Sequence, residues 1–209
     1  MSHLRRPALS RRHPVHVTLR VIAGLSSLRD GAVFFAVRAA LRAGKDRFGF
    51  RLVHFSVQGN HLQLLAEAEG REALSRGLQG LGVRLARAVN RRLERHGRVF
   101  ADRYHARSLR TPREARLALA YVLMNARRHG RGLRQLPPGF GDFCSSAAWF
   151  AGWGRPRELV FGLGSPTGAF DDAPVVPPRT WLLRDGATRA GPLDPDDAPL
   201  ATPSRQERH

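Results

Sequence analysis

The sequence predicts an α+β protein: a ferredoxin-like antiparallel sheet with helices packed on one face, an additional helix that contains a tyrosine, and an irregular C-terminal extension. Two observations predict this architecture. Over residues 15–130, strand and helix periods of apolar residues follow the order β-α-β-β-α-β-α, and the first six elements match the split β-α-β plan. After residue 130, Pro and Gly become more frequent and both periods fade.

Four strands are expected, at residues 16–22, 50–57, 61–68 and 104–110. The first is rich in β-branched residues and alternates apolar with polar side chains, as a half-buried strand does. Gln58-Gly59-Asn60 is a tight turn that would join the second strand to the third as a hairpin.

Three helices are expected, at about residues 30–48, 71–96 and 111–129, because their apolar residues recur at helical spacing. The third begins with Thr111-Pro112-Arg113-Glu114, where Thr caps the helix, Pro occupies its first position and Glu completes a capping box. The second contains three glycines that indicate either close packing or a bend: Gly77, Gly80 and Gly82.

The chain divides into three parts. Residues 1–14 form a basic N-terminal arm, residues 15–130 the domain, and residues 131–209 the C-terminal extension. Within the extension, the aromatic stretch 143–153 is expected to fold back on the domain. Residues 174–209 are rich in Pro, Asp and Ala, and are expected to be largely extended or disordered.

The net charge of +18 is unevenly distributed. Residues 1–135 contain 28 Lys and Arg against 8 Asp and Glu, a balance of +20, whereas residues 136–209 contain 7 against 9, a balance of −2. A GC-rich coding bias would explain why Lys45 is the single lysine, but it would not explain the scarcity of acidic residues. The excess therefore favours a nucleic-acid partner over a membrane surface, because no long basic segment has an aromatic amphipathic face.

Other classes of protein are disfavoured by what the sequence lacks. Cys144 is the single cysteine, which excludes disulfides within the chain and a cysteine zinc site. No apolar run approaches 18 residues, so no membrane span is expected. We expect a cytoplasmic, nucleoid-associated location. No P-loop or Ser/His/Asp order is present.

His61 and Gln63 are two residues apart on the third predicted strand, so their side chains should point to the same face, while Leu62 and Leu64 point to the other. Imidazole nitrogen and amide oxygen together suit Mg²⁺ or Mn²⁺ better than a soft metal. The alternative is ordinary: a histidine beside a glutamine on a strand is usually a surface or hydrogen-bonded polar residue.

Tyr121 lies in the middle of the third predicted helix, and Asn125 lies one turn later on the same face. A phenol becomes a useful nucleophile where a cation or arginines stabilise the phenolate. Arg103, Arg107, Arg127 and Arg128 are near in sequence and could serve that purpose, act as phosphate clamps, or be solvated surface residues, which is the usual role of a single arginine. The alternative is a half-buried core tyrosine with its hydroxyl at the edge.

Arg103-Tyr104-His105-Ala106-Arg107 is a second candidate cluster. A base could stack on Tyr104 while the arginines hold phosphates, or His105 could be a local hydrogen-bonding residue. His16 and His54 lie in predicted strands and are expected to be structural.

Three segments together resemble one family. Residues 57–65, with His61-Leu62-Gln63, look like the metal-binding strand of the HUH single-strand endonucleases. Within these enzymes, residues 99–105 and 121–125 look like the REP-associated tyrosine transposases, bacterial relatives of the single-tyrosine insertion-sequence transposases. The match covers about residues 15–130, with the motifs in the expected order and spacing.

The resemblance implies a single-stranded DNA endonuclease and strand transferase that acts beside a DNA hairpin in transposition. It implies Tyr121 as the nucleophile that forms a 5′-phosphotyrosine, with Mg²⁺ or Mn²⁺ held by His61, Gln63 and Asn125. DNA would contact residues of both clusters: Arg103, Tyr104, His105, Arg107, Arg127 and Arg128.

The sequence departs from the family pattern at two positions. Gln63 stands where the second histidine is usual, and Ala126 stands where a proline often follows the asparagine. Related viral replication initiators use a His-hydrophobe-Gln version, so metal binding survives in principle. Gln63 nevertheless keeps a second interpretation open, a domesticated hairpin-binding protein that no longer cuts DNA.

A third interpretation is an RNA-binding ferredoxin-like module. Its sheet aromatics should share one face as a stacking platform, and strict alternation places Phe50 and Phe55 on different faces. The oligomeric state stays open, a homodimer included.

Overall fold

The computed structural model describes residues 9–125, 138–154, 160–161 and 173–196. Its main sheet is antiparallel throughout, with strand order β2-β3-β4-β1-β5. Without the short β2, this is the strand order of the ferredoxin-like plan, so the predicted fold class is confirmed. The strands are β1 (Val15–Arg20), β2 (Asp46–Arg47), β3 (Phe50–Val57), β4 (His61–Ala68) and β5 (His105–Ser108).

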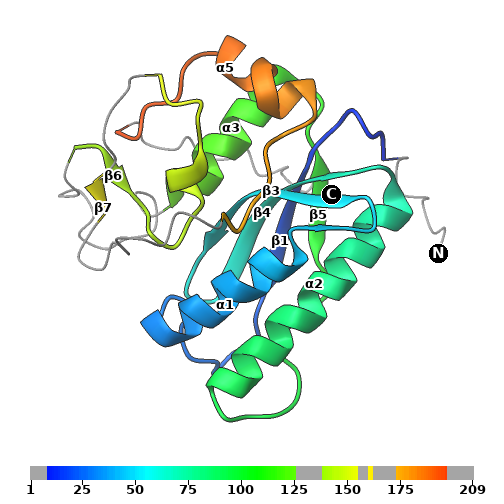
Figure 1. Ribbon diagram of the computed structural model, residues 1–209, viewed down its shortest axis with the longest axis vertical. Helices are drawn as coiled ribbons and strands as arrows, with labels where there is room; N and C mark the ends of the chain where they lie inside the picture. The colour runs from blue at the N-terminus through cyan, green and yellow to red at the C-terminus, as the bar shows by residue number, and fades with distance from the viewer. Residues whose placement is uncertain (1–8, 126–137, 155–159, 162–172, 197–209) are drawn as a thin grey trace, which may run out of the picture.

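One face of the sheet is covered by α1 (Gly31–Gly44) and α2 (Arg71–Arg92), which lie side by side in Figure 1. Alternate residues of the strands, such as Val17 on β1 and Leu64 on β4, are fully buried beneath the two helices. The apolar stripe of each helix supplies the other half of this core. No helix in the described part of the chain combines the length and the apolar composition that crossing a membrane requires.

The opposite face of the sheet is covered by α3 (Pro112–Leu123) together with short C-terminal helices (Figure 1). The predicted capping box begins α3: the Thr111 side chain accepts from the Glu114 amide, and the Glu114 carboxylate accepts from the Thr111 amide. Buried residues of α3, such as Leu119, pack on Leu65 of β4 in a second core. The sheet is therefore covered on both faces, and α3 is the additional helix.

The aromatic segment after residue 138 does fold back on the domain. β6 (Phe140–Gly141) pairs with β7 (Val160–Phe161), and a 3-10 turn spans Ala147–Trp149. Between them, the chain runs beside β3, where the Val57 amide donates to the Cys144 carbonyl at 2.8 Å. Arg29 also binds Asp142 through two hydrogen bonds of 2.8 and 2.9 Å.

Residues 173–196 contain helical turns where the sequence suggested extended or disordered chain. η3 (Leu182–Gly186) is a π-helical turn, and α5 (Ala187–Arg189) follows it directly. Leu182, Leu183 and Ala187 are buried against α3. The helical stretch is too short to show a period in sequence, so tertiary packing decides its structure.

A β-bulge corrects one sequence inference. The pairing of β3 with β4 shifts between Leu52 and His54, so that Val53 is the extra residue. Phe50 and Phe55 therefore share a face after all, and both are completely buried under α1 and α2. Being buried, they do not form an exposed stacking platform for RNA.

Gly77 on α2 permits the close approach of helix and sheet. A Cβ atom placed there would lie 2.2 Å from Cβ of Phe50, whereas one at Gly80 would have no neighbour within 4 Å. Of the two explanations for the glycines, close packing therefore applies at Gly77.

We expect Gly77→Ala to lower the free energy of unfolding by about 1–3 kcal/mol, because the clash outweighs the better helix propensity of alanine. Gly80→Ala is the matched control on the same helix and should raise it by about 0.5–1 kcal/mol. Chemical denaturation of both variants measures the difference. Equal effects at the two positions would contradict this account of the packing.

Candidate functional site

Polar side chains from three strands gather on the sheet face that α3 covers. Backbone pairing places Gln63 of β4 opposite Thr18 of β1, and Thr18 opposite His105 of β5. Paired residues of an antiparallel sheet point to the same side, so these three form one row across the sheet. The neighbouring row contains His16 and Arg107, and on the other side His61 is paired with Arg20.

His61 stands at the start of β4, half-buried, directly after the turn. Its Nδ1 lies 2.8 Å from Oδ1 of Asn60. When Nδ1 donates its proton to this carbonyl, Nε2 keeps its lone pair, which is the arrangement found in metal-ligating histidines. Leu62, the next residue, is fully buried in the opposite core, as strand alternation requires.

Gln63 is only 4% exposed, and its side chain is fixed by β1. Its Oε1 accepts a hydrogen bond of 2.8 Å from the Thr18 hydroxyl. The amide is therefore oriented by β1. The Thr18 bond uses one of the two lone pairs of the oxygen that would face a metal.

Tyr121 lies near the C-terminal end of α3 and is half-buried. Its ring packs edge-on against the ring of His16, with centroids 5.7 Å apart and planes at 70°. Since His16 shares a face of β1 with Thr18, which donates to Gln63, the structure places the tyrosine on the same side of the sheet as the predicted metal-binding strand.

His16 is the residue that sequence reasoning missed, because it was expected to be only structural. Its pKa is lowered to about 4, chiefly by burial; the Gln63 side chain opposes this shift, and the positive charge of Arg107 adds to it. Its Nε2 is buried and has no hydrogen-bond partner among the described residues. Alternation along β1 was the available signal, since His16 and Thr18 share a face.

Asn125 departs from its predicted position on the tyrosine helix. α3 ends at Leu123 with Met124 as its cap, and Asn125 is helical again, so a one-residue break separates it from the helix that contains Tyr121. Its side chain is completely buried, and in the described part of the structure neither its Oδ1 nor its Nδ2 has a hydrogen-bond partner. A buried amide without a hydrogen-bond partner costs about 1–3 kcal/mol of folding free energy, so the Asn125 amide would be stabilised by binding a ligand.

The donor set fits a hard divalent cation in type. His61 offers an imidazole nitrogen, while Gln63 and Asn125 offer amide oxygens, of which the Asn125 oxygen is unpartnered. The set contains no carboxylate or thiolate. Among the described residues, no group of three or more His, Cys, Asp or Glu side chains could hold a metal ion.

The second predicted cluster divides between the two sides of the sheet. Arg103, His105 and Arg107 are exposed, with the latter two on edge strand β5, next to the polar rows. Tyr104 is half-buried and packs against the core beneath α1 and α2. Arg127 and Arg128 lie outside the described residues.

His54 is structural, as expected. Its Nδ1 lies 3.1 Å from the Ser146 hydroxyl, its ring packs edge-on against Phe150, and burial lowers its pKa to about 3.

The lowered pKa of His16 makes stability depend on pH. The unfolded chain takes up a proton near pH 6.5 and the folded chain only near pH 4, so the free energy of unfolding falls as the pH drops through that window. We expect His16→Gln to reduce the loss between pH 7 and pH 5 by on the order of 1 kcal/mol, measured by urea denaturation at both values. An identical pH dependence in the parent and the variant would show that His16 is not held neutral.

Comparison with known proteins gives a likeness among solved structures. No protein-family model and no curated protein matches the sequence. Among solved structures, the chain is similar to a REP-associated tyrosine transposase bound to a REP hairpin, with a TM-score of 0.51 and 18% sequence identity. The alignment covers 62% of this chain and 75% of that one. At this identity the likeness establishes a shared fold, and the α+β architecture described above is the fold of that transposase.

Proposed function

We propose that this chain is a DNA-cleaving and strand-transferring enzyme that acts on single-stranded DNA beside a hairpin, with Tyr121 as its nucleophile. The observation that supports this most directly is the contact of Tyr121 with His16, which lies on the same sheet face as Thr18 and Gln63. The basic charge of residues 1–135 supports a DNA partner. The fold shared with a hairpin-bound transposase supports the same class of substrate.

In the proposed reaction, the Tyr121 oxygen attacks a DNA phosphorus and forms a new P–O bond. The bond from phosphorus to the 3′ oxygen breaks, and that oxygen leaves as a 3′-hydroxyl with the proton that the phenol has lost. The phosphate stays on the protein as a 5′-phosphotyrosine. Attack by a 3′-hydroxyl on this linkage reverses the step and completes strand transfer.

His61, Gln63 and Asn125 would hold the Mg²⁺ or Mn²⁺ ion. When bound, such an ion polarises the phosphate oxygens and stabilises charge on the phenolate. Two neighbouring residues orient these ligands: Asn60 fixes the His61 ring, and Thr18 fixes the Gln63 amide. His16, uncharged at neutral pH, supports the Tyr121 ring without placing a competing positive charge beside the metal site.

The exposed basic residues of edge strand β5 would contact the DNA backbone. His105 and Arg107 lie in the same rows as Thr18 and His16, so a strand that approaches Tyr121 passes over them. Arg103 precedes the strand and is also exposed. Their contacts would position the phosphate chain and would not read sequence.

We expect Tyr121→Phe to abolish a covalent protein–DNA adduct, because phenylalanine lacks the attacking oxygen. The assay incubates the full chain and Mg²⁺ or Mn²⁺ with a labelled single strand that contains a hairpin, then separates adducts on a denaturing gel. Tyr104→Phe removes the other phenol and should leave adduct formation intact at saturating protein. An adduct that persists in Tyr121→Phe, or a preference for RNA over DNA, would overturn the proposal.

A hairpin-binding protein without cleavage is the second candidate, and the Thr18 hydrogen bond to Gln63 favours it. It predicts tight, salt-sensitive binding of the hairpin strand without an adduct. Gln63→His then decides whether the ligand alone was lost, because an imidazole restores the usual pair of histidines. We expect this variant to form adduct at least tenfold faster than the parent; no gain with Gln63→His would place the defect elsewhere.

A further inference from the structure

A cavity of about 790 Å³ opens at the end of the sheet opposite His61. Its wall comes from segments far apart in sequence: residues 11–13 before β1, the hairpin of β2 and β3, the end of β4, Arg110 and Pro112 at the start of α3, and residues 179–182. His61 begins β4, and the wall residue Ala68 ends it. At a rise of about 3.3 Å per residue, the cavity therefore lies roughly 23 Å from His61 along this strand. None of its wall residues belongs to the site around Tyr121.

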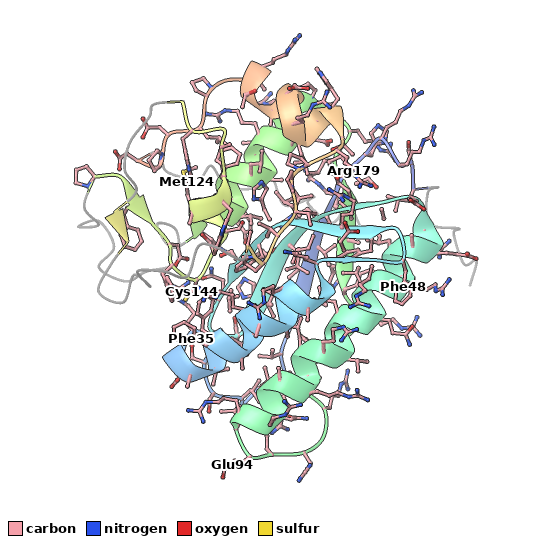
Figure 2. The ribbon with its side chains drawn as sticks, in the orientation of Figure 1. Phe35, Phe48, Glu94, Met124, Cys144 and Arg179 are labelled. Atoms are coloured by element: carbon pink, nitrogen blue, oxygen red, sulfur yellow. The ribbon has the colours of Figure 1, made fainter. Side chains whose placement is uncertain are left out.

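Two of the three acidic residues of the cavity wall, Glu67 and Asp46, have partners, and the third, Glu69, is exposed. The Glu67 carboxylate, 4% exposed, accepts from the amides of Arg179 at 2.9 Å and Thr180 at 2.7 Å. Arg51 lies 3.6 Å from it and donates to Asp46 at 2.8 Å. These bonds fix the backbone of residues 179–180 and neutralise negative charge at the cavity wall. Figure 2 shows Arg179 between the sheet and the C-terminal helical turns.

Four arginines of the wall are exposed: Arg11, Arg12, Arg110 and Arg179. Beside them, the Thr180 hydroxyl is buried and has no hydrogen-bond partner within the described ranges, in a residue only 8% exposed. The cavity therefore combines positive charge at its mouth with a buried group that still needs a hydrogen bond.

Trp181 supplies an aromatic surface to the same cavity and is 45% exposed. Its six-membered ring lies against Gly186, where a Cβ atom would come within 2.9 Å of the ring. Trp181 precedes the π-helical turn Leu182–Gly186 and Gly186 ends it, and this rare geometry is frequent at functional sites. The absence of a side chain at Gly186 lets the indole rest on the turn while its remaining surface faces the cavity.

We propose that this cavity binds one nucleotide of a single DNA strand, with the base stacked on Trp181 and the phosphates held by the exposed arginines. An exposed indole among arginines is how proteins hold single strands without reading sequence. The choice of DNA rests on the proposed function, while the nucleotide chemistry rests on the cavity alone. A strand cleaved at Tyr121 would thus have a second anchor at the far end of the sheet.

The test uses the full chain with Tyr121→Phe, which excludes covalent capture, and a fluorescein-labelled oligothymidylate. We expect Trp181→Ala and Arg179→Ala each to raise the Kd, measured by fluorescence anisotropy, roughly tenfold. Tryptophan fluorescence quenched by unlabelled oligothymidylate should be lost with Trp181→Ala, and Trp181→Phe should recover part of the affinity. Thermal melting checks that each variant is folded.

Matched controls lie outside the cavity. Phe35 is an exposed aromatic on α1 with Arg38 over its ring, and Arg184 is an exposed arginine beyond Trp181 (Phe35 is labelled in Figure 2). Phe35→Ala and Arg184→Ala should change the Kd less than twofold. Unchanged binding in a folded Trp181→Ala variant would overturn the proposal, as would thymidine monophosphate binding as tightly as the strand, because the ligand would then be a free nucleotide.

The outcome is separable from that of the proposed function. In a background with Tyr121 intact, Trp181→Ala should still form the adduct at saturating DNA if both proposals hold. Trp181-dependent strand binding without any adduct would support the cavity and overturn cleavage. An adduct together with strand binding that is unchanged in Trp181→Ala would support cleavage and overturn the cavity proposal.

Discussion

The candidate site depends on the register between β1 and β4. In this register Thr18 lies opposite Gln63 and Arg20 opposite His61, so every polar residue of the site is on the face under α3. Because side chains alternate with a period of two, a slip of one residue would bury Thr18 and His16 in the apolar core beneath α1 and α2. The fully buried Val17 and Leu64 on the other face hold the register, so the core and the site are specified by the same pairing.

Much of the fold could be predicted because local signals agree with the tertiary structure. β3 and β4 occupy the predicted residues, and the capping box at Thr111 begins α3 where expected. Strand alternation also put His61 and Gln63 on one face. These features depend on period and on capping chemistry, which neighbouring residues determine.

The remainder depends on contacts between distant segments, which a single sequence does not reveal. His16 becomes part of the site only because α3 lays Tyr121 against it. The end of α3 before Asn125 has no strong stop signal, so the helix was expected to continue. Leu182 and Leu183 gain their helical turns by packing on α3. In each case packing, and not local propensity, decides the structure.

The C-terminal segment has a consequence for how the protein can be divided. Residues 15–130 look self-sufficient by sequence, yet α3 packs its apolar side on Phe150, Leu183 and Leu193 as well as on the sheet. A fragment that stopped at residue 130 would expose this apolar side of α3 to water and would tend to aggregate. For recombinant production, the smallest practical unit is therefore one that retains residues up to 196. This unit keeps the hydrogen bonds from the Arg179 and Thr180 amides to the Glu67 carboxylate.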